Sequence, residues 1–374
     1  MSQDEAAGTA FDQSETRAMA ERLLAALADG SRSSDSEAAR IVGLRRLSGG
    51  ANMETWAFDR EHEGAIEPLI LRRLPGAPAA NSATDRAVGE LSLADEAALI
   101  VVAGRHGVPV PTVRQVLHGE HALGQGYIMS RERGEALPFR LLADDRYRDA
   151  REQLAYQCGQ TLARIHQIPL AALPQNLPDR SGAVLFQRAQ ALLDSYGNVS
   201  PVLQLGLNWL REHQYDNQRD KQHAQPNDQQ HSAARRTLVH GDFRNGNLLV
   251  DEHGLVAVLD WELAHIGDPV QDLGYISANV WRFGLPKPVG GFGEYADLLA
   301  GYASVCGAAP SMESIHYWQV HAALSWGMVC LLMLQMYRSG QDASLERAAI
   351  GRRLSEAEID LLLLLDGEPG GESS

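Results

Sequence analysis

The chain has 374 residues, of which 44% are hydrophobic and 22% are charged. This composition is typical of a soluble globular protein, long enough for one two-lobed unit or two tightly joined domains, and it excludes extensive disorder. Acidic residues outnumber basic ones by 48 to 33, for a net charge of −15, and no stretch is rich in Lys and Arg. Because a protein that grips a phosphate backbone needs the opposite balance, we expect no nucleic-acid partner.

Cysteine usage and hydropathy bear on the compartment. Cys158, Cys306 and Cys330 are far apart and show neither disulfide-framework nor zinc-ligand spacing, which indicates a reducing environment. The polar, acidic N-terminal residues contain no apolar leader, so a cytoplasmic protein is predicted. The most apolar segment, 322–334, is too short for a membrane span and is interpreted as a buried core helix.

The first third of the chain is predicted to be rich in strands. A helix is expected from about Ser14, because apolar residues recur there at helical spacing and Gly30 offers a stop. A second helix is expected over 87–104, and Pro109 ends it. Strands are predicted within 41–59, on both sides of a Gly-containing turn, and over 68–74, 112–117 and 126–131.

After Gly134 helices dominate. They are predicted at 146–167, 184–196, 201–213, 293–306, 311–338 and 343–366. One β-hairpin interrupts them.

The expected organisation has five parts. Residues 1–13 and 367–374 are expected to be disordered ends. Residues 14–131 form a predicted β-rich lobe, and 132–366 a predominantly helical lobe. Within the second lobe, 214–236 is rich in Gln, Asn and Asp and is expected to be a mobile polar insert.

The interrupting hairpin lies in the segment 237–275, TLVHGDFRNGNLLVDEHGLVAVLDWELAHIGDPVQDLGY. If its tight turn centres on His253 and Gly254, Asn247 falls opposite Asp260, within one pair. Amide and carboxylate oxygens are ligands that Mg²⁺ prefers, with waters and phosphate oxygens completing the octahedron. The hairpin therefore predicts a Mg²⁺ site.

The same segment has the spacing H-x-D-x-x-x-x-N from His240 to Asn247, followed by Asp260 at the end of a strand. This spacing is the catalytic pattern of kinases. Phosphoryl transfer needs a carboxylate that orients and deprotonates the attacking hydroxyl, and metal ions that neutralise the transferring group. Asp242 fits the first role, and Asn247 and Asp260 fit the second.

These motifs closely resemble the aminoglycoside phosphotransferase and choline-kinase-like superfamily, whose signature is HGD, then an Asn, then D-W-E. The variant DWELAHIGDPVQDLGY is most similar to a subgroup that includes the kinase-like domain fused to acyl-CoA dehydrogenases. The resemblance covers about 40–365 and implies an α+β, two-lobed protein-kinase-like fold. The small N-terminal lobe, 14–131, would be β-rich and bind the nucleotide. The larger C-terminal lobe, 132–366, would be mainly helical and carry the catalytic loop and the substrate site. Transfer would run from ATP or GTP to a small-molecule hydroxyl.

The resemblance extends to the nucleotide. LSGGANMETWAF resembles the nucleotide-covering hairpin, in which Ser48, Gly49, Gly50 and Asn52 would bring backbone N–H groups close to phosphates. YIMSRERGEALP resembles the lobe connector, whose backbone from Met129 to Arg131 would bind the adenine edge.

PLILRR resembles the third kinase strand, which normally carries a lysine on the nucleotide phosphates. Arg72 stands there instead and would bind phosphate through a rigid fork. Glu96 is its candidate ion-pair partner, with Glu90 and Asp95 as alternatives. Arg73 is expected to be an exposed cation at the strand edge.

Several residues near the motif have two open interpretations. His240 could act in catalysis, although its family role is to orient the loop. Arg244 could steady the γ-phosphate or an anionic substrate, or be a plain surface arginine. Glu262 would share the face of Asp260 if the strand continues, and could contact metal, water or substrate, or only solvent. Asp268 is interpreted as a helix N-cap, and Asp272 as a brace for the catalytic loop.

Aromatic residues and one histidine are assigned mainly to the core. His166 lies among apolar residues and is interpreted as a satisfied core histidine. Trp281, Trp318 and Trp326 are also expected in the core, although one or two aromatic residues could line the substrate side.

The predicted activity is Mg²⁺-dependent transfer of a γ-phosphoryl group to a small-molecule hydroxyl, on a hydroxyacyl-type metabolite or an aminoglycoside-like alcohol. The final third carries no dense acidic cluster of the kind a polycationic aminoglycoside needs. The alternative is a nucleotide-binding pseudokinase with a regulatory role, indicated by the missing strand lysine. The complete set of Asp242, Asn247 and Asp260 argues against it. The only expected partner is the substrate, with no membrane partner, and the protein would be a monomer or homodimer.

Overall fold

The computed structural model describes residues 13–28, 39–47, 53–74, 91–181, 183–197, 200–219 and 236–367. The chain divides into two compact units. The first comprises Met1–Arg105, Pro109–Arg133 and Pro174–Asn176, and the second comprises His106–Val108, Gly134–Leu173 and Leu177–Ser374.

The main passage from the first unit to the second falls after Arg133, two residues beyond the predicted boundary. The segments expected to be disordered or mobile lie almost entirely outside the described residues. Helix α6, Pro201–Arg219, nevertheless continues six residues into the predicted insert, so 214–219 is helical.

The first unit is built on a five-stranded sheet with the order β1-β2-β3-β5-β4, in which all neighbouring strands are antiparallel. Its strands are β1 (Arg40–Leu47), β2 (Glu54–His62), β3 (Ala65–Leu74), β4 (Val113–Leu117) and β5 (Gln125–Ser130). Two longer helices belong to this unit, α1 (Gln13–Leu27) and α2 (Leu93–Arg105). All of these elements match predicted ones, with shifted ends.

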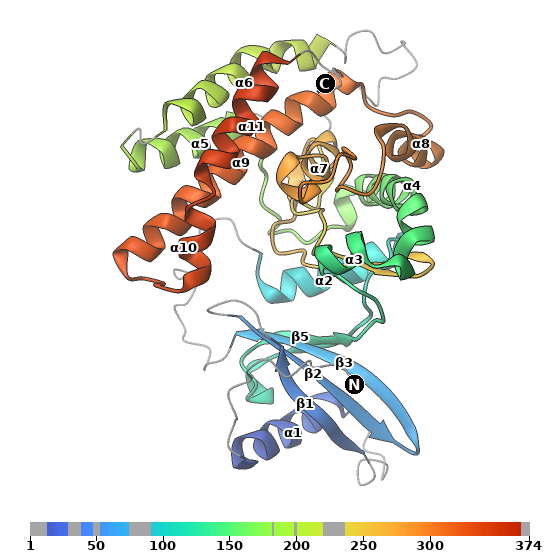
Figure 1. The fold of residues 1–374 in the computed structure, drawn as a ribbon. Coiled ribbons are helices and arrows are strands. Elements are labelled where there is room, and N and C mark those ends of the chain that lie inside the picture. Colours follow the sequence, from blue (N-terminus) through green and yellow to red (C-terminus); the bar gives the residue numbers. More distant parts are fainter. Residues whose placement is uncertain are drawn as a thin grey trace. The chain divides into compact units, whose positions relative to one another are not determined.

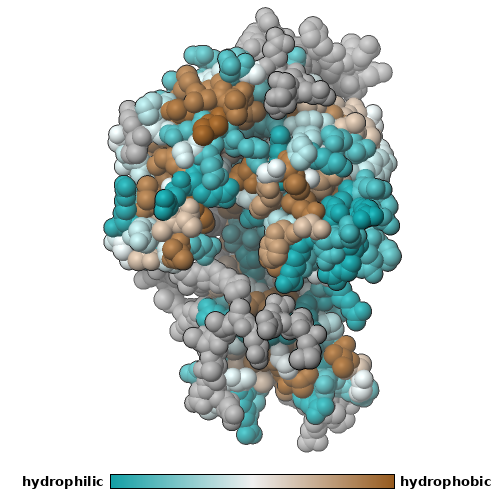
Figure 2. Space-filling model, viewed as in Figure 1, coloured by the Kyte–Doolittle hydropathy of each residue, from teal (hydrophilic) through white to brown (hydrophobic). Residues whose placement is uncertain are grey.

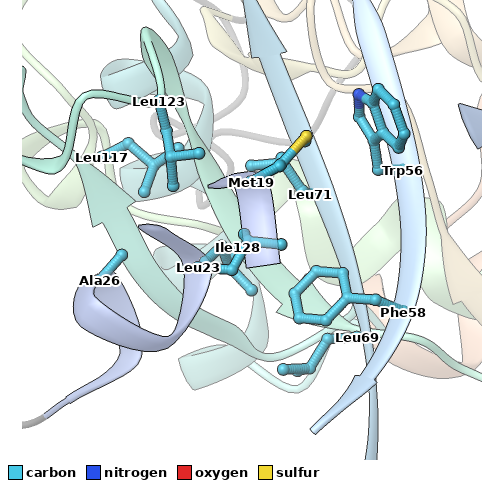
Figure 3. Close-up of a cluster of buried hydrophobic side chains, with 10 residues drawn as sticks. All are labelled: Met19, Leu23, Ala26, Trp56, Phe58, Leu69, Leu71, Leu117, Leu123 and Ile128. Atoms are coloured by element: carbon cyan, nitrogen blue, oxygen red, sulfur yellow. The ribbon is translucent and has the colours of Figure 1, made fainter. Parts of the chain in front are cut away.

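One face of this sheet is covered by α1. Met19, Leu23 and Ala26 recur at helical spacing and lie in one buried cluster with alternate strand residues such as Leu69 and Leu71, as Figure 3 shows. All five are buried. Because successive strand residues face opposite sides, the residues between and after the two leucines, Ile70 and Arg72, belong to the other face.

The second unit is mainly helical (Figure 1). Its α-helices are α3 (Pro138–Ala143), α4 (Arg148–His166), α5 (Ala183–Ser195), α6 (Pro201–Arg219), α7 (Val270–Ile276), α8 (Tyr295–Cys306), α9 (Met312–Ser339), α10 (Leu345–Gly351) and α11 (Leu354–Asp366). Two small antiparallel sheets pair β6 (Thr237–Val239) with β9 (His265–Gly267), and β7 (Leu248–Asp251) with β8 (Gly254–Val258). The predicted α+β class, with a β-rich first part and a helical second part, is confirmed.

Helix α9 is the central helix of the second unit and packs against α6, α7, α10 and α11. Ser311 caps its N-terminus by accepting the Ser314 N–H, and Gly340 ends it in the left-handed conformation. Within the described residues it is the one helix long and apolar enough to pass for a membrane span. The predicted burial of 322–334 holds for one face only, since Val329 and Leu332 are both 39% exposed. Figure 2 shows hydrophobic side chains in several separate surface patches among hydrophilic ones.

The helix predicted over 343–366 is in fact two helices, α10 and α11. The break follows Gly351, where a Cβ atom would lie 2.9 Å from the Leu334 backbone. Close packing on α9 therefore excludes a larger side chain, and both short helices contact α9 on either side of the break.

Candidate active site

The β7–β8 hairpin carries the motif predicted to hold the chemistry. Asp251 pairs with Gly254, so the two-residue turn is 252–253, and the predicted centre at His253 and Gly254 is wrong by one position. Gly254 has a φ of 126°, and a Cβ atom there would lie 2.1 Å from Gln157 Oε1. The positive φ favours glycine here, and the Gln157 amide fills the space that a side chain would take.

The register places Asn247 opposite Leu259, whose N–H donates to the Asn247 carbonyl at 2.8 Å. Asp260 therefore follows one position later, within the one-pair margin of the prediction. It leaves the strand in the left-handed conformation, with a φ of 63°. Such a φ is uncommon for residues other than glycine, although Asp adopts it more readily than most. This left-handed residue marks the point where the chain turns away from the strand and carries the Asp260 carboxylate with it.

Asp242 is the centre of the hydrogen-bond network in the loop before β7. Its Oδ1 accepts from Arg244 Nε at 2.9 Å, and its Oδ2 accepts from Asn247 Nδ2 at 2.5 Å. The same Asn247 amide also donates to the Asp242 backbone carbonyl at 2.9 Å. Burial raises the pKa of the Asp242 carboxyl, and the nearby Arg244 and His240 oppose part of that rise. The loop thus brings together all four residues predicted to be catalytic, since the Asp242 N–H also bonds to His240.

The residues predicted to bind metal suit Mg²⁺ by chemistry. Asn247 uses its amide nitrogen on Asp242, which leaves its carbonyl oxygen as the ligand atom. The charge of Asp260 acts on Asp242 and raises its pKa, so the two carboxylates are close enough to repel, and a cation would relieve that repulsion. Across the described ranges no three His, Cys, Asp or Glu side chains form a metal cluster. Waters and phosphate oxygens would have to complete the shell, as Mg²⁺ allows.

Glu262 was expected on the face of Asp260 if the strand continued, and the strand does not continue. Strand β8 ends at Val258, and the Ala264 N–H donates to the Trp261 carbonyl at 3.0 Å, which closes a turn around Glu262. The face argument for Glu262 is therefore wrong, and its role at the metal stays a prediction.

His240 is fully buried and has one defined tautomer. The Asp242 N–H donates to His240 Nδ1 at 3.2 Å, so the ring proton must sit on Nε2, which lies 3.2 Å from the Leu259 carbonyl. Burial lowers the pKa of His240 and keeps the ring neutral. Its ring centroid lies 4.7 Å from that of Trp261. These contacts favour the loop-orienting role over a catalytic one.

Asp272 braces the loop from α7. Its two oxygens accept the N–H groups of His240 at 2.8 Å and Gly241 at 2.9 Å. His166 Nε2 lies 3.1 Å from the same carboxylate, and His166 Nδ1 lies 3.0 Å from the Tyr302 hydroxyl. Burial alone would raise the pKa of Asp272, but the bonds from His166 and the backbone lower it. His166 is the predicted satisfied core histidine, yet its partner is the brace.

Asp268 sets the start of α7, because its Oδ1 accepts the Val270 N–H at 3.0 Å. Pro269 stands at the N-cap position itself, so the predicted N-cap lies one residue too early, although Asp268 still bonds to the first residue of the helix.

Asn245 is a site residue that the motif analysis missed. It is fully buried, and its amide nitrogen donates to the carbonyls of Trp281 at 3.3 Å and Gly290 at 2.5 Å. These bonds tie the catalytic loop to the segment after α7. No local pattern could have found them, because the partners are 36 and 45 residues away.

Arg244 is not a plain surface arginine. Besides its bond to Asp242, its Nη1 donates to the Asn245 carbonyl at 2.9 Å, and its guanidinium lies 4.4 Å from the centroid of the Trp281 ring. Tyr275 lies nearby, and burial together with the Asp242 charge raises the pKa of its phenol well above the usual value. The arginine is therefore fixed between a carboxylate and an aromatic face.

In the first unit, Arg72 and Glu96 form the predicted ion pair. Arg72 Nε lies 3.8 Å from Glu96 Oε1, which also accepts from the Tyr127 hydroxyl at 3.1 Å. Glu96 is only 1% exposed. Of the alternatives, Asp95 is bonded to Ser92 at the start of α2, and position 90 lies outside the described residues.

Arg73 is not the exposed cation that was expected. Its side chain is 14% exposed and pairs with Glu54 at 2.8 Å, while its Nη1 donates to the Leu123 carbonyl at 3.1 Å. The side chain lies on the α1 face of the sheet, and burial there requires the ion pair.

The remaining predicted nucleotide contacts have mixed outcomes. Ser48, Gly49, Gly50 and Asn52 lie outside the described residues.

At the end of β5, the Ser130 N–H donates to the Thr112 carbonyl and the Arg131 N–H to the Pro68 carbonyl, both at 2.9 Å. These two donors are committed within the sheet. The adenine contacts predicted at Met129 and Arg131 stay a prediction and would have to use other backbone groups.

Comparison with known proteins agrees with the family that the catalytic motif indicated. Residues 43–307, most of the chain, match the phosphotransferase enzyme family. This chain belongs to that family. The predicted recognition is confirmed, and family and fold together make the chain a small-molecule kinase.

Two curated relatives of this phosphotransferase are acyl-CoA dehydrogenase family members. Member 10 of Mus musculus is 27% identical over 252 residues, which cover 63% of this chain and 21% of the relative. Member 11 of Pongo abelii is 33% identical over 98 residues, covering 24% of this chain and 12% of the relative. The chain thus spans about a fifth or less of the relatives it matches.

Solved structures show the fold. A candidate aminoglycoside phosphotransferase from Ralstonia eutropha has a TM-score of 0.62 at 20% identity and covers 87% of this chain and 93% of its own. A choline/ethanolamine kinase family protein from Mesorhizobium loti has a TM-score of 0.53 at 17% identity, covering 93% and 95%. The phosphotransferase therefore has the protein-kinase-like fold that the sequence predicted.

Proposed function

We propose that this phosphotransferase moves the γ-phosphoryl group of ATP or GTP, with Mg²⁺, to the hydroxyl of a small molecule. The observation that carries the proposal is the pairing of Asp242 with Asn247 in a loop whose hairpin presents Asp260 one residue after Leu259. These are the base and the two metal ligands that phosphoryl transfer requires.

Asp242 is the proposed base. The acceptor hydroxyl gives its proton to a carboxylate oxygen of Asp242 as its own oxygen bonds to the γ-phosphorus, and the bond from that phosphorus to the nucleoside diphosphate oxygen breaks. A base works best when its pKa is near the working pH, so the raised pKa of Asp242 suits the role. Arg244 and Asn247 hold the carboxylate in position.

Asn247 and Asp260 are the proposed Mg²⁺ ligands, with Glu262 as a further candidate. A bound Mg²⁺ would neutralise charge on the transferring phosphoryl group. In the first unit, Arg72, held by Glu96, would bind nucleotide phosphates as a fork in place of the usual lysine.

We infer a hydroxyacyl-type acceptor in preference to an aminoglycoside-like alcohol. Support comes from the acyl-CoA dehydrogenase family names of the relatives and from the lack of a dense acidic cluster in the final third of the sequence. A cytoplasmic location and a monomer or homodimer remain part of the proposal.

The experiment is a transfer assay with γ-labelled ATP, Mg²⁺ and a panel of hydroxyacyl esters and aminoglycosides, run on the wild type and Asp242→Asn. We expect labelled product from a hydroxyacyl acceptor with the wild type and a loss of at least about a hundredfold in the variant. Label transfer by Asp242→Asn at the wild-type rate would contradict the assignment of the base.

A further inference from the structure

Three aromatic side chains of the second unit form a row beside the catalytic loop, and we call them the aromatic cluster: Tyr275, Trp281 and Trp326. Ring centroids are 5.6 Å apart for Tyr275 and Trp281, and 5.5 Å apart for Trp281 and Trp326. Ala278 and Ala322 pack with them. Two of the three come from the segment around α7 and one from α9, so distant parts of the sequence build the row.

The aromatic cluster is one side chain away from the proposed base. Arg244 bonds to Asp242 through Nε and covers the Trp281 ring with its guanidinium. The charge of Asp242 also acts directly on the Tyr275 phenol. A molecule lying on this row would therefore bring its own groups close to Asp242.

The cluster is not sealed in the core. Tyr275 and Trp326 are partly buried, and beyond Trp281 the chain exposes Phe283 at 48% and Leu285 at 38%. Exposed aromatic and aliphatic side chains this close to a site offer apolar contact to a bound molecule.

The cluster is poorly suited to a cation. An aromatic cage binds a cation through open, electron-rich ring faces. Here a guanidinium group already lies over each indole ring. The Arg244 guanidinium is 4.4 Å from the Trp281 centroid, and that of Arg353 is 5.3 Å from the Trp326 centroid. A second positive charge would meet like charge at both positions.

Three carboxylates beside the cluster are already engaged by nearby side chains. The pairs are Asp242 with Arg244, Glu356 with Arg353, and Asp360 with Asn279. A polycationic substrate needs several carboxylates that are free to pair with its ammonium groups. These three are already bonded to side chains of the protein.

Trp281 supplies a second, independent observation. The ring is 7% exposed, and its Nε1 is buried with no hydrogen-bond acceptor among the described residues. Trp326 Nε1 is likewise buried with no acceptor in the described part of the chain. A buried donor without an acceptor costs free energy, which an oxygen brought by a ligand would recover after a small rotation of the ring.

We propose that the aromatic cluster binds the phosphoryl acceptor, and that this acceptor is a neutral or anionic alcohol with an apolar body and a carbonyl oxygen that accepts from Trp281 Nε1. This inference rests on the proposed function, because it assumes that Asp242 is the base. It selects against quaternary ammonium alcohols and aminoglycosides through Arg244 and Arg353.

The first test compares two alcohols of the same shape and different charge, choline and 3,3-dimethylbutan-1-ol, by calorimetric binding to the full chain with Mg-ATP present. We expect the neutral alcohol to bind at least about tenfold more tightly, because one like-charge contact in a partly buried site is worth that much. Equal or tighter binding of choline would overturn the inference. So would the absence of binding by both alcohols in protein that binds Mg-ATP.

The second test isolates the indole N–H with methyl 3-hydroxyhexanoate and 1-methoxyhexan-3-ol, which differ only in the carbonyl oxygen. Trp281→Phe keeps a ring under Arg244 and removes the donor. We expect the ratio of kcat/KM for the ester to kcat/KM for the ether alcohol to fall about three- to tenfold, through the KM of the ester, because only the ester has the carbonyl oxygen that the indole N–H would bind. An equal fall for both acceptors, or none, would contradict the inference.

Trp318→Phe is the matched control, since Trp318 Nε1 is also buried and has no acceptor in the described part of the chain, but lies outside the aromatic cluster. It should leave the ratio of the two kcat/KM values unchanged. If Trp281→Phe fails to fold, Arg353→Gln still tests the effect of charge. It should reduce the ratio by which 3,3-dimethylbutan-1-ol binds more tightly than choline. Loss of Mg-ATP binding by the wild type would refute the proposed function itself. Mg-ATP binding with a preference for choline would refute only the acceptor class.

Discussion

Asp272 accepts the backbone N–H of His240 at 2.8 Å, so a carboxylate on α7 fixes the entry to the catalytic loop. The same carboxylate is bonded to Gly241 and His166. The geometry of the catalytic loop therefore depends on Asp272, thirty positions beyond Asp242. Asp272 is fully buried, so it would act through the loop and not on the substrate.

Asp272→Asn should weaken both activity and stability. The amide keeps the shape but loses the negative charge and one of the accepting oxygens, which leaves a buried N–H without an acceptor. We expect the free energy of unfolding to fall by about 2–3 kcal/mol and kcat to fall more than KM changes. Urea unfolding and steady-state kinetics measure the two effects. Asp268→Asn, at the half-buried start of α7, is the control and should cost about 1 kcal/mol or less. An unchanged kcat in Asp272→Asn would show that the loop needs no brace.

The lowered pKa of Asp272 predicts a pH dependence of stability. A carboxyl whose folded pKa is below its unfolded value stabilises the fold fully above the unfolded pKa, about 3.9, and loses that contribution as pH falls through the folded pKa. The wild type should therefore lose more stability between about pH 5 and pH 2 than Asp272→Asn does. Unfolding midpoints across this range provide the measurement. Parallel curves for the two proteins would mean that Asp272 does not carry the acid sensitivity.

Leu23→Ala should destabilise the first unit. Leu23 is fully buried between α1 and the sheet (Figure 3), so its removal leaves a cavity and costs about 2–5 kcal/mol. Leu24→Ala, next to it and only partly buried, should cost clearly less. Thermal or urea unfolding distinguishes them, and equal costs would argue against α1 as the cover of this face.

Arg72→Met and Arg72→Lys examine the replacement of the strand lysine. The methionine removes the cation that would bind the nucleotide phosphates, so we expect KM for ATP to rise at least about tenfold. It also takes away the ion-pair partner of Glu96, which is 1% exposed. The lysine should fall in between, since it restores a point charge without the fork. Tyr127→Phe, which removes only one bond to Glu96, should raise KM about two- to tenfold. Unchanged KM in Arg72→Met would remove this arginine from the nucleotide site.

Local patterns carried most of the fold. Apolar residues at helical spacing predicted α1 and α9 within two residues, and the Gly-containing hairpin predicted β7 and β8. The three-residue strand β9 was missed because it is too short to show a period, and its pairing with β6 spans about thirty residues. The break between α10 and α11 was missed because it depends on contact with α9 rather than on local sequence.

The candidate site was predictable where the chemistry is local and not where it is assembled at long range. The motif spacing predicted that Asp242 and Asn247 act together, and the resemblance to the third kinase strand predicted the pair of Arg72 with Glu96. The bond from His166 to Asp272 joins residues 106 positions apart, and no sequence pattern records it. The stack of Arg353 on Trp326 likewise arises from the packing of α11 on α9.

The most direct test of the nucleotide and metal site is a thermal shift with Mg-ATP on the wild type and Asp260→Ala. We expect stabilisation of the wild type of about 2.7 kcal/mol at a nucleotide concentration a hundred times Kd, and none for the variant. The apo proteins should unfold at similar temperatures, which shows that the variant is folded. Equal stabilisation of both proteins by Mg-ATP would contradict the assignment of Asp260, and no shift for the wild type at millimolar nucleotide would contradict a kinase.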